Sequence, residues 1–133
     1  WSGVSLTNCI IRVLITQSTT IVDLAANGYG LQTNGANINL VSYGANAALA
    51  TVSGATNLVN STNAHIHIEF DPASAIRLYV NGVIKATQDT VGDIPAGTTA
   101  QDYNIFASII RAGGADVGNE VAQISNLEAG EED

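Results

Sequence analysis

The sequence predicts an all-β protein folded as a single antiparallel β-sandwich. Apolar and polar side chains alternate along several short segments, which is typical of strands with one buried face. Gly, Pro, Asn and Asp separate these segments at short intervals, as in sandwiches and barrels. No window combines the 3.6-residue apolar spacing of a helix with capping residues. About ten strands are therefore expected, at residues 9–16, 20–24, 29–33, 37–43, 49–53, 65–70, 76–80, 83–86, 103–111 and 120–127.

The first of these strands, CIIRVLIT at residues 9–16, is rich in β-branched side chains and apolar on both faces apart from Arg12. Such a strand is expected in the centre of a sandwich. Asn27-Gly28 and Asn34-Gly35 then predict the turns of a meander. Residues 88–102 form a long loop, and loops of this length in small domains are often functional.

The segment at residues 63–87 contains three of the expected strands. Ile66, Ile68 and Phe70 alternate with His65, His67 and Glu69, so one set is expected to face the core and the other to point away from it. Asp71-Pro72-Ala73-Ser74 predicts a turn. Asn81-Gly82 lies between two β-rich runs and predicts a two-residue hairpin, because a type I′ turn needs positive φ at both central residues.

Residues 65–83 read His-Ile-x-Ile-x-Phe-Asp, a short turn, and Leu-Tyr-Val-Asn-Gly-Val. This order resembles the signature of laminin-G-like and concanavalin-like β-sandwiches, the lectin/glucanase superfamily, where Trp-His-His-Val-Ala-Val-x-Phe-Asp precedes a Leu-Tyr-Val-Asp-Gly hairpin. His65 falls on the second family His and Asp71 on the Asp, whereas Asn63 and Ala64 replace the family Trp and first His. The resemblance implies a jelly-roll sandwich whose concave face and edge loops bind glycans or peptides.

Composition limits the function classes. The 133 residues suffice for one domain that buries about two thirds of its unfolded surface. Only 12% of the residues are charged and the net charge is −8, with four Lys and Arg in total. Nucleic acid is therefore not an expected partner. Membrane insertion is not expected either, because the longest apolar run, residues 9–15, contains Arg12 and is too short to span a bilayer.

The chain begins at Trp1 and contains no Met, so it is expected to be a processed chain or the ordered part of a longer one. The single Cys9 excludes an intramolecular disulfide framework, and a buried, inert thiol is the expected reading. Weakly charged, β-rich chains recur in virus structural proteins and in extracellular adhesins. These features predict a virion or extracellular location, a homo-oligomer, and other virion subunits as partners.

Residues suited to carbohydrate recognition are scattered along the chain near expected turns and on the expected polar strand faces. Sugar binding needs an aromatic surface for C–H contacts and Asn, Asp or Arg side chains for hydroxyl groups. The expected ligand is a glycan or another cell-surface receptor. The candidate ligand-binding residues are Tyr29, Asn34, Asn37, Tyr43, His65, His67, Arg77 and Tyr103.

The sequence offers two candidate metal sites, and the alternative is that the protein binds no metal or other cofactor. His65, His67 and Glu69 lie at i, i+2 and i+4, so all three point to one side of a strand and could bind a transition metal. Asp89, Asp93 and Asp102 in the long loop could bind calcium, which prefers several converging oxygens. The simpler reading is that these side chains are solvated, and no cofactor is expected.

An enzymatic activity is the least favoured class of function for this sequence. Glucanases of the superfamily carry Glu-x-Asp-x-x-Glu, and here Glu69-Phe70-Asp71 is followed by Ser74 at the position of the second Glu. No nucleophile elbow, P-loop or dinucleotide fingerprint is present in the sequence. The sequence therefore predicts a non-enzymatic structural or adhesion domain of a virus or phage particle (fibre, tail or capsid decoration). The alternative is a secreted lectin-like module of a bacterial extracellular protein.

Overall fold

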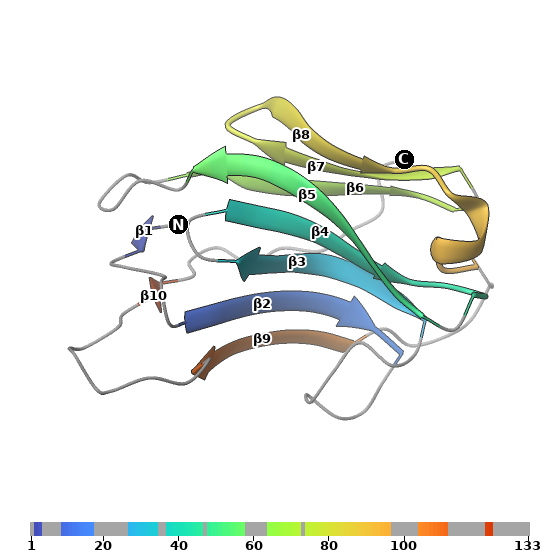
Figure 1. The fold of residues 1–133 in the computed structure, drawn as a ribbon, viewed down its shortest axis with the longest axis horizontal. Coiled ribbons are helices and arrows are strands. Elements are labelled where there is room, and N and C mark those ends of the chain that lie inside the picture. Colours follow the sequence, from blue (N-terminus) through green and yellow to red (C-terminus); the bar gives the residue numbers. More distant parts are fainter. Residues whose placement is uncertain are drawn as a thin grey trace.

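The computed structural model describes residues 2–3, 9–17, 27–34, 37–46, 48–57, 64–72, 74–96, 104–111 and 122–123. Within these ranges the chain forms β-strands and one short 3₁₀ turn (Figure 1). Their bounds are β1 Ser2–Gly3, β2 Cys9–Thr16, β3 Gly28–Asn34, β4 Asn37–Tyr43, β5 Leu49–Asn57, β6 Ile66–Asp71, β7 Ala75–Val80, β8 Val83–Gln88, η1 Val91–Asp93, β9 Asn104–Arg111 and β10 Ala122–Gln123.

Two main antiparallel sheets make up the fold. The large sheet has the strand order β5-β4-β3-β2-β9, and the small sheet has the order β6-β7-β8. The small sheet lies over the β4 and β5 side of the large one (Figure 1). The short strands β1 and β10 pair with each other. This arrangement confirms the antiparallel β-sandwich predicted from the sequence.

The inner faces of the two sheets share one hydrophobic core. Its buried members are Ile11 and Val13 of β2, Leu31 of β3, Ile38 and Leu40 of β4, Ile76, Leu78 and Val80 of β7, Ala86 of β8, and Ile94 after η1. Fully burying one Val, Leu or Ile side chain contributes about 1.5–3 kcal/mol. The facing rows of these side chains therefore determine how the sheets pack.

Strand β2 has the central character that its sequence predicts. Ile11 and Val13 are buried in the shared core, while Leu14 and Thr16 are buried on the opposite face of the same strand. β2 also has a hydrogen-bonded neighbour on each side, β3 and β9. An apolar run without alternation thus corresponds to a strand that is covered on both faces.

Strand β6 of the small sheet separates its side chains by face. Ile66, Ile68 and Phe70 of β6 pack against the shared core. The intervening positions of β6, such as His67, face away from it. This confirms the alternation expected from the sequence.

The turn between β7 and β8 has φ values of 52° at Asn81 and 76° at Gly82, and Val80 pairs with Val83. The predicted Asn-Gly hairpin is therefore confirmed.

The two other Asn-Gly pairs have different outcomes. Asn34 is the last residue of β3 and pairs with Asn37, the first residue of β4, so the chain reverses at the predicted place, although Gly35 lies outside the described residues. The predicted turn at Asn27-Gly28 is wrong, because Gly28 is the first residue of β3 and pairs with Thr16 and Tyr43. The expected strand at residues 20–24 lies outside the described residues, and only residues 122–123 of the expected last strand are described.

Gly54 marks an irregularity between β4 and β5. The register of the two strands shifts between Asn37 and Asn39, and a Cβ atom at Gly54 would lie 2.2 Å from the carbonyl oxygen of Ile38. A glycine permits this close backbone approach.

Among the described residues, no helix is long and apolar enough to span a membrane.

We predict that Gly82→Ala lowers the free energy of unfolding by about 1–2 kcal/mol, because an L side chain is disfavoured at positive φ. A Cβ atom at this position would meet no other atom within 4 Å, so the effect comes from the backbone conformation alone. Urea unfolding measures it. The exposed Asp89→Ala serves as the control, with an expected change below about 0.5 kcal/mol. Equal stability of Gly82→Ala and the wild type would contradict the type I′ turn.

Candidate functional site

The outward-facing side of the small sheet carries the main polar cluster of the described residues. The pairing of β6 with β7 places Glu69 opposite Arg77 and His67 opposite Tyr79. These four side chains belong to the set that alternates with the core residues, so they face away from the shared core. We call the exposed side formed by His67, Glu69, Arg77, Tyr79, Ile84 and Thr87 the outer face of the small sheet.

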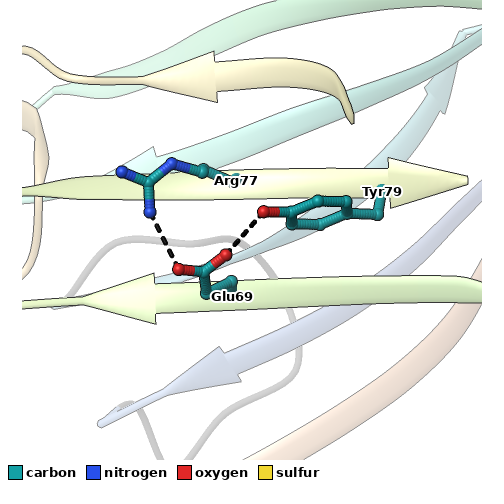
Figure 2. A network of polar contacts seen from close by, with 3 residues as sticks. All are labelled: Glu69, Arg77 and Tyr79. Atoms are coloured by element: carbon teal, nitrogen blue, oxygen red, sulfur yellow. Dashed lines mark hydrogen bonds and ion pairs between the residues drawn. The ribbon is translucent and has the colours of Figure 1, made fainter. Parts of the chain in front are cut away.

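The Glu69 carboxylate is held by two neighbours on β7 (Figure 2). An Nη1–H of Arg77 donates to Oε1 over 2.8 Å, and the Tyr79 hydroxyl donates to Oε2 over 2.6 Å. The side chains of Arg77 and Glu69 are 30% and 40% exposed. The carboxylate therefore has a fixed orientation although it is in contact with solvent.

These contacts stabilise the ionised form of Glu69. The hydrogen bond from Tyr79 is the largest cause that holds the pKa of Glu69 below its ordinary value, and the charge and hydrogen bond of Arg77 act in the same direction. Partial desolvation opposes the shift, and the charge of His67 adds a smaller favourable contribution. At neutral pH the pair therefore presents an ionised carboxylate beside a guanidinium, with no net charge between them.

The two histidines have different positions. The His67 ring lies 5.5 Å from the Tyr79 ring at an interplanar angle of 57°. His65 precedes β6, and its backbone N–H donates to Oδ1 of Asn81 over 2.9 Å while its carbonyl accepts from the Asn81 N–H over 2.8 Å. His67 thus belongs to the polar cluster, and His65 closes the neighbouring hairpin through its backbone.

The transition-metal alternative is not supported. In the described part of the chain, no three His, Cys, Asp or Glu side chains gather in a way that could hold a metal ion. Glu69 instead bonds to Arg77 and Tyr79. The expected three-residue ligand set fails because a shared strand face places the side chains in a row, whereas a ligand set requires them to converge.

The loop with the predicted calcium ligands is joined to the β4–β5 connection. Asn46 donates from Nδ2 to Oδ1 of Asp93 and from its backbone to the Gly92 carbonyl, each over 2.8 Å. Asp89 is exposed at the end of β8, and Asp102 lies outside the described residues. Calcium binding therefore stays a prediction, with one of its three candidate ligands engaged by an amide.

The other predicted ligand-binding residues do not join the cluster. The Tyr29 ring stacks on Phe70 with centroids 4.6 Å apart and packs against the shared core. Tyr29 therefore occupies an inward position of β3, away from the polar cluster, and its role in ligand binding stays a prediction. Tyr43 packs on Leu14 and Val41, on the other face of the large sheet. Asn37 is exposed at the start of β4. The side chain of Asn34 and the whole of Tyr103 lie outside the described residues.

Sequence reasoning found His67 and Arg77 but missed Tyr79, Ile84 and Thr87. The available signal was the hairpin geometry. The Asn81-Gly82 turn pairs Val80 with Val83, and the turn after Asp71 pairs Asp71 with Ala75. From this pair, each step backward along β6 matches one step forward along β7. The turn alone therefore places Glu69 opposite Arg77 and His67 opposite Tyr79.

Two antiparallel sheets that share one core define the class of this protein as an antiparallel β-sandwich. Residues 11–117 match the laminin-G-type family described as the concanavalin A-like lectin/glucanases superfamily. The chain belongs to this superfamily, and is a lectin/glucanase-type domain. Laminin-G-like domains are generally non-enzymatic binding modules. No curated protein and no solved structure is significantly similar to the chain.

We predict that Tyr79→Phe raises the pKa of Glu69 toward its ordinary value, because the variant loses the strongest hydrogen bond to the carboxylate. A lowered folded-state pKa stabilises the protein above the unfolded-state pKa, and this contribution disappears as the pH falls through the folded-state pKa. An NMR titration of the Glu69 carboxyl carbon measures the shift. Tyr43→Phe, on the other sheet, is the control and should leave the titration unchanged. An unchanged midpoint in Tyr79→Phe would contradict the assigned cause.

Proposed function

We propose that this domain is a non-enzymatic adhesion module that recognises a glycan on a cell surface, as a structural domain of a virus or phage particle. The observation that carries the glycan proposal is the outer face of the small sheet. It combines an aromatic ring, a fixed carboxylate and a guanidinium on a rigid support, in a chain of the lectin/glucanase superfamily. Rigid aromatic and hydrogen-bonding side chains are the elements that sugar recognition requires.

The arrangement around Glu69 favours binding over hydrolysis. A glycosidase general acid needs a raised pKa, whereas Tyr79 and Arg77 lower the pKa of Glu69. Ser74 stands at the position of the second Glu of the glucanase motif, and its backbone N–H donates to the Asp71 carbonyl over 3.1 Å in the turn. The position that would carry the second carboxylate thus lies in a turn and bears a hydroxyl group.

The composition supports the assignment to a particle. Charged residues make up 12% of the chain, and the surface polarity comes mainly from Asn, Thr, Ser and Gln. Exposed apolar side chains are also present outside the outer face of the small sheet, with Val83 and Val91 each more than half exposed. A weakly charged surface with exposed apolar positions suits a domain that packs against copies of itself or against a shell.

We predict that a glycan-array screen of the purified domain detects specific binding that is unchanged by a calcium chelator. Glu69 and Arg77 provide the polar contacts without a metal, so removal of calcium should have no effect. Binding that the chelator abolishes would instead implicate the loop of Asp89 and Asp93. No binding with or without calcium would contradict glycan recognition and leave a purely structural role.

We predict that the domain forms a homo-oligomer that persists on dilution, because particle fibres and decorations assemble from identical subunits. Analytical ultracentrifugation over a wide concentration range measures the oligomeric state. A monomer at all concentrations would contradict the particle assignment. Together with specific sugar binding, it would favour a secreted lectin-like module.

A further inference from the structure

The outer face of the small sheet consists of two parallel rows of side chains. Strand pairing sets His67, Tyr79 and Ile84 side by side across β6, β7 and β8. It sets Glu69, Arg77 and Thr87 side by side in a second row. Adjacent residues on one face of a strand are two positions apart, so the rows are separated by about 7 Å.

The first row presents two ring faces and one aliphatic side chain, and we call this surface the apolar floor. The His67 and Tyr79 rings lie 5.5 Å apart, and Ile84, opposite Tyr79, is 52% exposed. The hairpin that pairs Val80 with Val83 also places Ile84 opposite the ring, and the register shift that follows leaves Lys85 without a partner on β7. The bond from the Tyr79 hydroxyl to Glu69 fixes the ring in place (Figure 2). A ligand that lies on this floor therefore meets a surface that is already ordered.

The second row provides hydrogen-bonding groups of both kinds. Each Glu69 oxygen accepts one bond within the cluster and retains further lone-pair capacity. A guanidinium has five N–H donors, and Glu69 accepts from Nη1 of Arg77. Thr87, opposite Arg77, is exposed and has a hydroxyl group. A sugar hydroxyl can donate to a carboxylate and accept from a guanidinium at the same time, so the row suits adjacent hydroxyl groups.

We propose that the two rows form the glycan-binding site, and that the ligand is a neutral sugar whose pyranose ring lies over His67, Tyr79 and Ile84 with its hydroxyl groups toward Glu69, Arg77 and Thr87. A pyranose has an apolar C–H face beside a rim of hydroxyl groups, which matches an apolar row beside a polar one. This inference rests on the proposed function and specifies its site and ligand class.

The charges select a neutral sugar over an acidic one. Glu69 lies 2.8 Å from Arg77 and offsets its charge. An acidic sugar would have to compete with Glu69 for the guanidinium and approach a protein of net charge −8. The four basic residues of the chain are Arg12, Arg77, Lys85 and Arg111, and of these Arg77 alone lies in the two rows.

The test compares the intact wild-type chain with variants on one array of neutral gluco-, galacto- and manno-oligosaccharides and their uronic-acid counterparts. The wild type should bind a neutral member at least about tenfold more tightly than its uronic-acid counterpart. Ile84→Asp should weaken neutral binding by about tenfold or more, because it places a charge on the apolar floor. Since Ile84 is exposed, this variant should still fold, and thermal unfolding verifies that it does.

Glu69→Gln gives the sharpest result, because it preserves the shape of the side chain but releases the charge of Arg77. Its preference should shift from the neutral sugar toward the uronic acid by about tenfold, an effect that a purely structural role of Glu69 would not produce. Tyr43→Phe, on the large sheet, is the matched control and should bind as the wild type does.

The outcomes separate the two proposals. Glycan binding that Ile84→Asp and Glu69→Gln leave unchanged would overturn this site, while glycan recognition by the domain would still hold. A wild-type preference for uronic acids would overturn the ligand class. The absence of binding to every sugar on the array would overturn both this inference and the proposed function.

Discussion

In β7, Ile76, Leu78 and Val80 are buried against the large sheet, and this burial determines where the other side chains of the small sheet lie. Because successive side chains of a strand point to opposite faces, burying these three turns Arg77 and Tyr79 outward. A slip of one residue would expose all three apolar side chains, each worth about 1.5–3 kcal/mol when buried. Exposed ion pairs contribute little to stability, so the core sets the register and the polar cluster follows from it.

The two sheets differ in how their second faces are used. On the large sheet, Leu14 and Val41 are 3% and 1% exposed on the face opposite the shared core, so that face is closed around them. On the small sheet, the side chains opposite the core are polar or exposed. Tyr43 and Tyr79 therefore have different roles despite their similar chemistry. The Tyr43 ring contributes to packing, whereas the Tyr79 hydroxyl orients a carboxylate in contact with solvent.

The sequence was sufficient to predict the sandwich, the strand at residues 9–16 and the hairpin at Asn81-Gly82, because each depends on local patterns of apolar side chains or on backbone preference. The predicted turn at Asn27-Gly28 is wrong for the opposite reason. Gly28 pairs with Thr16 and with Tyr43, both distant in the chain, so strand pairing there outweighs the local turn preference. The inward position of Tyr29 was not predictable, because alternation alone does not say which face of a strand is buried when both sets of side chains are partly apolar.

The sequence predicted some residues of the candidate site but not their arrangement. Arg77 and His67 were identified by residue type, but their union with Glu69 and Tyr79 depends on the register between β6 and β7. The position of Ile84 opposite Tyr79 follows from the same hairpin that pairs Val80 with Val83, whereas the position of Thr87 opposite Arg77 depends on the register shift between Leu78 and Tyr79. This shift has no local signature in Val83-Ile84-Lys85, so the second row is complete only in the three-dimensional structure.

The most direct test of the account is NMR shift mapping, in which the amide spectrum of the intact chain is titrated with the neutral oligosaccharide that it binds best. The account predicts that the shifted amides belong to β6, β7 and the Ile84 region of β8, with little change in β2, β3 and β4. Shifts concentrated around Tyr43 on the large sheet, or around Asn46 and Asp93 in the joined loops, would contradict the claim that the outer face of the small sheet is the functional surface.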